Sequence, residues 1–326
     1  MKERKKLMKT CAIVTDAMEF VKGRKGMFKT LTMVGILLIV QMTCMVTVVA
    51  APSPKPGQVI QDPENPAFML KNEDKNGDGL LDPYWLVGHG GPESFFYLSQ
   101  VLPGWDQDSI LDFIDQHGGN AIYIEVWGHD WEGSPSPDRY PDWHRWIKKM
   151  DQYGIVAFFI FYDDHVDHQG DDVLRAMVNE FETHPNIIWC ICEEEHFANI
   201  EGEKASRIAD VIRAADDYGH VIGIHDTWYP RIDMLAYQVS NKSVSEVHET
   251  ALKFFDETRM SNSAEDHYAD VNKRDPDRTR KVVWANAVAG NYFVQLGSWE
   301  DKKNRKPPEI GEKRRKGGQE EHILEL

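Results

Sequence analysis

Short apolar runs alternate with amphipathic segments along the chain from Tyr84 onward. Short runs of this kind are typical of buried strands, and eight of them occur: 84–87, 121–127, 155–162, 187–192, 220–225, 232–239, 257–261 and 291–297. Strands that alternate with helices over roughly 250 residues predict an α/β protein with a (β/α)8 TIM barrel. A doubly wound sheet is the alternative, but no glycine-rich phosphate loop follows the first run.

Helical spacing of apolar residues marks the segments between the strands: 108–118, 143–154, 171–184, 205–219 and 243–255. Several of them end at a glycine or a His-Pro step, which are ordinary helix stops. After Gly297 the sequence becomes a charged tail, residues 298–326, instead of another amphipathic segment. The predicted barrel therefore covers residues 84–297, with its eighth helix missing or altered.

The first fifty residues differ from the rest of the chain. Basic residues lead into an apolar run that reaches Ala51, and small residues stand at the end of this run. This order predicts a secretory signal peptide over residues 1–50, cleaved near Ala50, with Met27 as an alternative start. We therefore expect a secreted, extracellular protein. The alternative is an uncleaved membrane anchor formed by residues 31–51, the one case in which a membrane contact is expected.

A proline-rich stretch over residues 51–67 predicts a linker, and residues 68–83 then carry the oxygen spacing of a calcium loop. Its expected ligands are Asp74, Asn76, Asp78, the Leu80 carbonyl and Asp82. Position 12 of the loop is Trp85, where an EF-hand has a bidentate glutamate, so the loop departs from a true EF-hand. A structural Ca²⁺ in this loop is the only cofactor predicted. The alternative is a turn that leads into the first strand.

The cysteines outside the leader are Cys190 and Cys192, which share one face of a predicted strand. Their Cα atoms would lie roughly 6.5 Å apart, near the upper limit for a disulfide, so we predict two core residues. A structural zinc site is not expected, because no second pair of ligands accompanies them.

The net charge is −16, and the first fifty residues contribute +6, which leaves about −22 for the remainder. A surface this acidic repels phosphate backbones, and no basic patch with interleaved aromatic residues offsets it. Nucleic acid is therefore excluded as a partner, and the oligomeric state stays open.

The apolar run 187–192 ends in three carboxylates and a histidine, residues 193–196. An isolated carboxylate resists burial, so a core strand that ends in this way has reached a wet, functional edge. Side chains alternate along a strand, which puts Cys190, Cys192 and Glu194 on one face and Trp189, Ile191 and Glu193 on the other. We expect Glu194 to point into the barrel mouth. The alternative is that these glutamates cap a helix or solvate a turn.

Polar residues follow most of the predicted strands, and barrel enzymes place their chemistry at the C-terminal ends of the strands. Tryptophans at such ends offer flat faces for sugar rings, although they are as often core residues. The predicted substrate-binding residues are His89, Trp127, Tyr162, Glu193, His225, Trp228 and Gln238.

Four segments together resemble the glycoside hydrolase barrels of clan A, particularly the apiosidase-like group: 79–96, 110–128, 143–164 and 186–196. The resemblance covers residues 81–297. It implies a general acid/base glutamate at the end of the fourth strand, which falls on Glu194, and a nucleophilic glutamate at the end of the seventh strand. In such enzymes an asparagine precedes the acid/base and binds the sugar 2-hydroxyl, whereas this chain has Glu193.

Glu265 is the predicted nucleophile, with Asp266 and Glu257 as competitors. A retaining glycosidase needs two carboxyls about 5 to 5.5 Å apart, one protonated and the other ionised. Adjacent glutamates raise one another's pKa, which suits an acid/base. The resulting prediction is a retaining O-glycosidase that acts on a polysaccharide or oligosaccharide and needs no catalytic cofactor.

Two other functions use the same residues. A metal-dependent barrel hydrolase or isomerase would bind one or two divalent ions. Its ligands would come from His89, His129, Asp163, His165, Glu194, His225 and Asp226. A non-catalytic carbohydrate-binding barrel is the third hypothesis, because Glu193 replaces the usual asparagine.

Overall fold

The computed structural model describes residues 54–89, 95–98, 106–126, 135–162, 170–193, 200, 202–239, 242–264 and 276–295. Two compact units divide the chain, Met1–Ala51 and Pro52–Leu326, and all described residues belong to the second. The predicted signal peptide and the charged tail lie outside the described residues. Among the described helices, none is long and apolar enough to cross a membrane.

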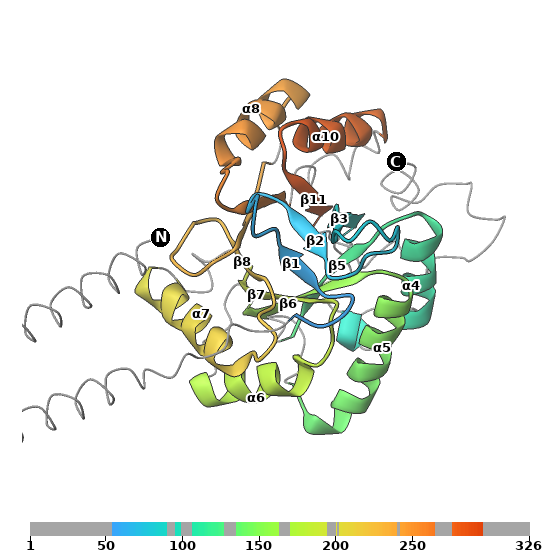
Figure 1. The fold of residues 1–326 in the computed structure, drawn as a ribbon, viewed down its shortest axis with the longest axis vertical. Coiled ribbons are helices and arrows are strands. Elements are labelled where there is room, and N and C mark those ends of the chain that lie inside the picture. The colour runs from blue at the N-terminus through green and yellow to red at the C-terminus, as the bar shows by residue number, and fades with distance from the viewer. Residues whose placement is uncertain are drawn as a thin grey trace, which may run out of the picture. The chain divides into compact units, whose positions relative to one another are not determined.

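Eight parallel strands form one sheet, in the order β4-β11-β10-β9-β8-β7-β6-β5 (Figure 1). They are β4 (Val87–His89), β5 (Ala121–Glu125), β6 (Val156–Tyr162), β7 (Ile187–Cys192), β8 (Ile222–His225), β9 (Met234–Tyr237), β10 (Met260–Ser263) and β11 (Tyr292–Gln295). The predicted (β/α)8 barrel is thus confirmed, because consecutive strands are neighbours and run parallel. The first and seventh strands lie two to three residues further along the chain than their apolar runs.

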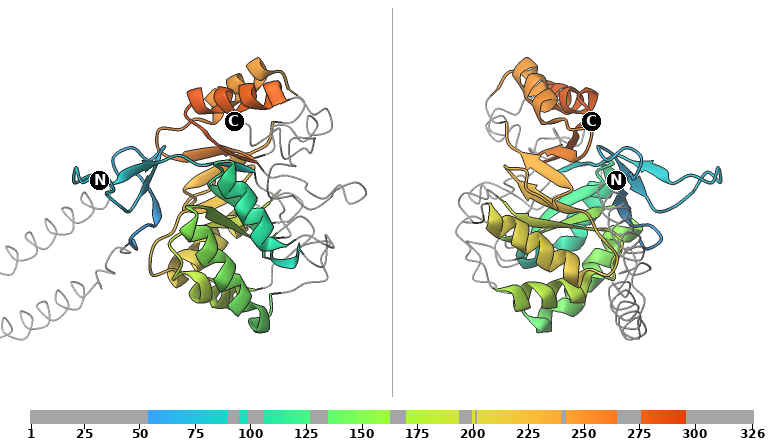
Figure 2. Two further views of the ribbon diagram at one scale, coloured as in Figure 1. Left: turned by 90° about the vertical axis from the view of Figure 1, so that its right-hand side faces the viewer. Right: turned by 60° about the vertical axis from the view of Figure 1, so that its left-hand side comes forward.

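In the described part of the chain, six α-helices connect the strands, and they surround the sheet (Figures 1 and 2). They are α4 (Gln107–Gln116), α5 (Tyr140–Gln152), α6 (Asp171–Phe181), α7 (Glu203–Ala215), α8 (Val244–Phe254) and α10 (Pro276–Val288), with short 3-10 turns η1 (Phe95–Tyr97) and η2 (Pro137–Arg139). Side chains cap the N-termini of two of these helices. Asp106 accepts a hydrogen bond from Ser109 N at α4, and Ser243 forms a capping box with Glu246 at α8.

The connection from β8 to β9 contains no helix, although all of its residues, 226–233, are described. Eight residues with a proline at position 230 are too few for a helix and two loops. Trp228 and Tyr229 pack against the core at this place instead. The sequence predicted a missing helix after the eighth strand, which lies outside the described residues. It assigned no helical segment between the predicted strands 220–225 and 232–239, and the structure agrees.

Alternating residues divide the core into two layers. One cluster fills the barrel interior and includes Tyr123, Phe158 and Cys190, whereas the other lies between the strands and the helices and includes Trp189 and Ile191. This division follows the predicted alternation along β7. Cys192 departs from this alternation: it was predicted to share a face with Cys190, but it packs with the outer cluster. Both cysteines are buried and no disulfide joins them, as predicted. Burial raises the pKa of the Cys190 thiol to about 12.

Asn262 is a polar residue within this interior. Its Nδ2 donates to the Tyr123 hydroxyl at 2.8 Å and to the Val294 carbonyl at 3.2 Å, and its Oδ1 accepts from Val294 N at 2.8 Å. The side chain is fully buried, so these bonds offset the cost of its desolvation and tie β10 to β11 and β5.

A small antiparallel sheet precedes the barrel: β1 (Val59–Gln61), β2 (Met69–Lys71) and β3 (Asp82–Tyr84). Val59 and Met69 join the interior cluster, and Met69 N donates to the Tyr292 hydroxyl at 2.6 Å. Tyr292 is the first residue of β11, so this sheet covers the N-terminal end of the barrel. β1 lies within residues 51–67, so the prediction of a linker is wrong at this strand. The sequence did not show it, because one buried valine among polar residues leaves little periodicity to detect.

The seam between β4 and β5 closes through one asparagine. Asn120 N donates to the Val87 carbonyl, and Val87 N donates to Asn120 Oδ1, both at 2.8 Å. Asn120 Nδ2 also donates to the Trp85 carbonyl at 2.7 Å. The backbones approach so closely that a Cβ added to Gly88 would lie 2.4 Å from the Ala121 carbonyl oxygen. A side chain at position 88 would therefore force the seam apart.

We predict that Gly88→Ala lowers the free energy of unfolding by about 2 to 3 kcal/mol, because it overpacks backbone that has no room to move. Gly223→Ala is the matched control, since it also adds a methyl group to a barrel strand but its nearest neighbour would lie 3.8 Å away. Urea unfolding followed by tryptophan fluorescence compares the two. Equal stability losses would contradict this account of the seam.

Candidate active site

Titratable and polar residues gather at the C-terminal ends of the barrel strands. We call this set the C-terminal rim: Glu125 on β5, Tyr162 on β6, Glu193 after β7, His225 on β8 and Gln238 after β9. The strands are parallel, so these ends meet on one side of the barrel. Three of the residues, Glu125, Tyr162 and His225, are buried.

Glu125 is a rim residue that the sequence analysis did not single out. It pairs in register with Ile160, which belongs to the interior cluster, so its side chain lies on the interior side of the sheet. The carboxyl is only 3% exposed. The available signal was a glutamate inside the otherwise apolar run 121–127, because a buried carboxylate needs a reason.

Tyr97 lies close to Glu125. Its hydroxyl donates to the Val126 carbonyl at 2.9 Å. Burial raises the pKa of Tyr97, Arg139 opposes the rise, and the charge of Glu125 adds to it. The tyrosine therefore remains a neutral hydrogen-bond donor beside the carboxylate.

His225 points to the interior side of β8, because it pairs in register with the interior residue Ala236. Burial lowers its pKa, and the charge of Asp226 opposes this shift. His225 Nε2 lies 3.6 Å from Asp226 Oδ1, beyond a hydrogen bond. The imidazole is thus held neutral, with one nitrogen able to donate and the other to accept.

Asp226 has a φ of 81°, in the left-handed region that non-glycine residues seldom adopt. Its N–H donates to the Ala236 carbonyl at 2.9 Å, which holds this conformation at the end of β8. Strained residues of this kind cluster at functional sites, so the strain agrees with a functional role for the rim.

Tyr162 and Glu193 meet where β6 and β7 end. Glu193 N donates to the Tyr162 carbonyl at 2.9 Å, so the ladder continues one residue beyond β7. Alternation from Trp189 and Ile191 predicts the same face for Glu193, but Cys192 already departs from that alternation, so the face of Glu193 stays a prediction. Burial raises the pKa of Tyr162, so its hydroxyl stays protonated.

The remaining predicted site residues lie outside the described residues, at the ends of other strands, or away from the rim. Glu194, Glu265 and Trp127 lie outside the described residues, as do His129, Asp163 and His165 of the metal alternative. His89 is the last residue of β4 and pairs with Gln295, and Gln238 is exposed just after β9.

Trp228 lies elsewhere. It is half-buried against the outer core cluster, and the Arg259 guanidinium lies 4.8 Å from its ring centroid. Arg259 directly precedes β10, at the N-terminal side of that strand. This placement gives the indole a packing role in the connection that replaces a helix.

The predicted calcium loop forms a turn that leads into β3. The Asp74 carboxylate accepts from Gly77 N, Asp78 N and Gly79 N at 2.7, 3.1 and 2.9 Å. Gly77 and Gly79 have positive φ, which lets successive N–H groups converge on one carboxylate. Leu80 and Asp82 complete the segment. No three His, Cys, Asp or Glu side chains in the described part of the chain are grouped to hold a metal, and calcium binding stays a prediction.

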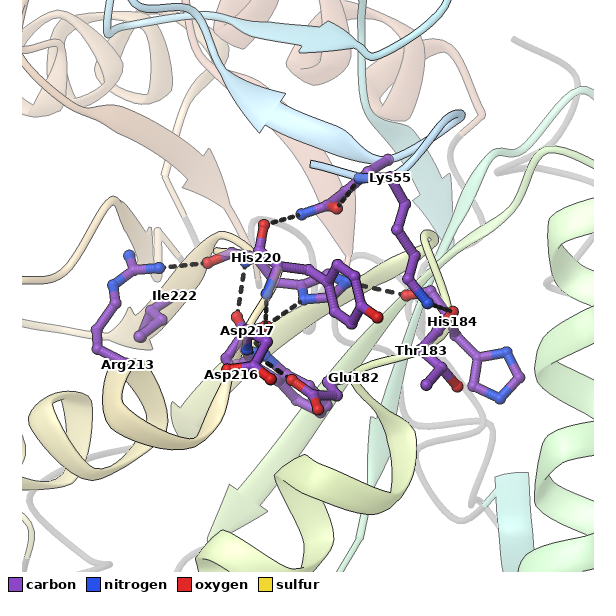
Figure 3. Close-up of polar contacts among 12 residues, drawn as sticks. Lys55, Glu182, Thr183, His184, Arg213, Asp216, Asp217, His220 and Ile222 are labelled. Carbon is purple, nitrogen blue, oxygen red and sulfur yellow. Dashed lines mark hydrogen bonds and ion pairs between the residues drawn. The ribbon is translucent and has the colours of Figure 1, made fainter. Parts of the chain in front are cut away.

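A second set of polar residues lies at the opposite, N-terminal end of the strands (Figure 3). His220 is fully buried, and its Nδ1 and Nε2 lie 2.9 Å from Asp216 Oδ1 and from the His184 carbonyl. The His220 ring thus bridges two acceptors, the Asp216 carboxylate and a backbone carbonyl. Asp216 also accepts from Trp189 Nε1 at 3.2 Å. Burial acts to raise the pKa of Asp216, but hydrogen bonds and the charge of His220 lower it below its ordinary value.

Neighbouring contacts connect the His220–Asp216 pair to the rest of the molecule. Arg213 donates to the His220 carbonyl and pairs with Asp233, whose Oδ2 accepts from Ile222 N at 2.8 Å. Lys55 Nζ donates to the Thr183 carbonyl at 2.7 Å, which ties the N-terminal segment to the same loops (Figure 3). The arrangement stabilises the N-terminal end of the barrel, whereas barrel enzymes place their chemistry at the other end.

His184 provides a pH-dependent part of this stability. Its Nε2 lies 2.7 Å from His144 Nδ1, and burial, with the charge of His144 next, lowers its pKa to about 4. The unfolded chain binds a proton near pH 6.5 but the folded chain does not. Stability is therefore present above about pH 6.5 and is lost as the pH falls toward 4, at about 1.4 kcal/mol per pH unit.

We predict that His184→Gln flattens this acid loss, because glutamine keeps a polar group near the position of Nε2 but does not titrate. The free energy of unfolding, measured in urea across this pH range, should then fall on the order of 2 kcal/mol less than in the parent. His117→Gln is the control, at the end of α4, where Nδ1 bonds to the Phe113 carbonyl. Parallel pH profiles for the parent and His184→Gln would contradict the assignment.

No protein-family description and no curated protein matches the chain. Among solved structures, a candidate glycoside hydrolase from Bacteroides vulgatus matches with a TM-score of 0.60 and 14% identity, over 78% of this chain and 59% of that one. A glycoside hydrolase family 5 protein from the same organism has a TM-score of 0.52 and 16% identity, over 75% and 64%.

An endoglucanase from Pseudomonas stutzeri also matches, with a TM-score of 0.52 and 12% identity over 74% of this chain and 93% of that one. At such identities the likeness shows a shared fold. The chain spans about three fifths of the length of the two Bacteroides vulgatus structures. The resemblance to clan A barrels is thus supported at the level of the fold, and the apiosidase-like group stays a prediction.

Proposed function

We propose that this chain is a retaining glycoside hydrolase that cleaves O-glycosidic bonds in a polysaccharide or oligosaccharide. The observation that carries the proposal is the C-terminal rim of a parallel barrel, where Glu125 and His225 are buried on the interior side of the sheet. A barrel of this kind is shared with solved structures described as glycoside hydrolases. Carboxyl groups held at such a rim are what acid-catalysed glycoside cleavage requires.

In the proposed reaction Glu194 is the acid/base and Glu265 the nucleophile. Glu194 donates its proton to the glycosidic oxygen as the bond to the anomeric carbon breaks, and the Glu265 carboxylate bonds to that carbon. The deprotonated Glu194 then takes a proton from water, whose oxygen attacks the anomeric carbon and releases Glu265. Each carboxyl thus returns to its starting state, and no cofactor takes part.

The rim residues would orient the sugar. The neutral His225 imidazole, on the interior side of β8, is a hydrogen-bond donor for sugar oxygens. Tyr162 instead packs with the outer cluster, on the helix side of the sheet. An ionised Glu193 can only accept hydrogen bonds. It would therefore accept a hydrogen bond from a sugar hydroxyl, whereas an asparagine amide can also donate one. Glu125 adds a further carboxyl group at the rim, and when ionised its negative charge would favour the protonated form of a nearby acid/base. His89, Trp127 and Gln238 stay proposed contacts.

We predict that Glu194→Gln lowers kcat for a polysaccharide by about 10² to 10⁴, because glutamine cannot donate the proton. An aryl glycoside whose leaving group needs no proton should lose far less in the bond-breaking step. Glu195→Gln is the matched control, since it makes the same change in the adjacent glutamate, which has no proposed catalytic role. Equal activity of Glu194→Gln and the parent on both substrates would rule out this acid/base.

Glu193 in place of asparagine favours one other candidate function, a carbohydrate-binding barrel without hydrolysis. Binding of oligosaccharides by the parent protein, with no release of reducing sugar from a broad panel, would support that function. Loss of activity after chelation, restored by a divalent ion, would support the metal-dependent alternative.

We also propose export, from the basic lead and apolar run before Ala51. When the full chain is expressed in a secreting bacterium, the protein should appear in the culture medium and should start at Ala51. The N-terminal sequence of the secreted material checks this. Full-length protein retained in the membrane fraction would instead support an anchor formed by residues 31–51.

A further inference from the structure

A groove of about 690 Å³ lies between α8 and α10, away from the interior of the barrel. The two helices lie side by side in every view (Figures 1 and 2). Its lining comes from both helices: Val244, Ser245, His248, Asp277, Arg280, Lys281, Trp284, Ala285 and Val288.

An exposed tryptophan stands at the centre of this lining. Trp284 is 67% exposed and Val288 is 68% exposed, whereas Val282 and Asn286 of the same helix are buried. The fold therefore uses the opposite face of α10 for packing and leaves the indole outward. A large aromatic ring exposed beside a groove commonly marks a binding surface.

Polar side chains flank the indole. His248 Nδ1 donates to the Ala285 carbonyl at 2.9 Å, which leaves Nε2 as the other hydrogen-bonding atom of the ring. Arg280 pairs with Asp277 along the same helix. A flat apolar face bordered by both donors and acceptors matches a sugar ring, which has an apolar C–H face and hydroxyls around its edge.

The position of the groove connects it to the candidate active site. Val244 and Ser245 lie at the start of α8, and Asp277 lies at the start of α10. These helix starts follow the C-terminal ends of β9 and β10, so the groove begins at the same end of the barrel as the C-terminal rim. It then runs along the helices toward Val288. A polymer held at the rim would therefore have a path into the groove.

We propose that the α8–α10 groove binds a neutral polysaccharide chain outside the catalytic site, with Trp284 stacked on a sugar ring. This inference rests on the proposed function, which makes a polysaccharide the substrate.

A second copy of the chain fits the groove less well. Nine residues line it, whereas a stable interface uses about 20 to 30 residues on each side. The net charge of −16 also makes two copies repel each other.

The test compares Trp284→Ala with Leu252→Ala in the full chain. Leu252 is 53% exposed on α8 and does not line the groove, so its variant removes a similar apolar surface elsewhere. Depletion onto insoluble cellulose and mannan measures polysaccharide affinity, and hydrolysis of small aryl glycosides measures the catalytic site. We expect Trp284→Ala to lower the affinity about tenfold with unchanged aryl glycoside hydrolysis. Leu252→Ala should behave as the parent in both assays.

The outcomes separate this inference from the proposed function. Parent-like polysaccharide binding by Trp284→Ala, with aryl glycosides still hydrolysed, would overturn the groove and leave the proposed function standing. Binding that depends on Trp284 in a chain without any hydrolysis would support the groove and overturn the proposed function. A dimer in sedimentation that Trp284→Ala dissociates would overturn the groove as a sugar site, because it would be an interface between copies.

Discussion

Closure of the parallel sheet at the β4–β5 seam is the constraint on which the rest of the structure depends. An open edge would leave backbone groups unpaired and would expose the interior cluster to water. Asn120 supplies an amide that imitates a backbone pairing with Val87, and Gly88 lets the two strands approach without a side chain between them. Once the seam is closed, alternation along every strand assigns residues to the interior or to the helix layer.

The two ends of the closed barrel differ in what their polar groups do. At the N-terminal end the His220–Asp216 pair is enclosed by acceptors and donors, and β1 to β3 cover the interior. The His220 ring and the Asp216 carboxylate both have hydrogen-bond partners, which favours a rigid base. At the C-terminal rim Glu125 and His225 are buried on the interior side, and Asp226 keeps a strained backbone. Strain and buried titratable groups on a rigid base are what a catalytic site requires.

The missing helix between β8 and β9 shows how the outer layer tolerates change. Trp228 and Tyr229 fill the space over the strands, and the Arg213–Asp233 pair holds the short connection against α7. Packing by side chains thus replaces packing by a helix. The sequence pattern assigned no helix to this connection, but it predicted Trp228 as a sugar contact, because the packing neighbours of an irregular segment leave no periodic signal. Glu125 was missed for a related reason, since its strand otherwise looks like plain core.

Hydrophobic patterning by itself determined the eight strands, most of the helices and the faces of β7, because burial imposes a period of two on strands and about 3.6 on helices. It also led to the ends of the strands as the place for chemistry. Only the tertiary structure decided which end of the barrel the small sheet covers, how the seam closes, and which polar residues become buried there. Those outcomes depend on contacts such as Met69 to Tyr292 and Asn262 to Tyr123, which join residues far apart in the chain and leave no local periodic signal.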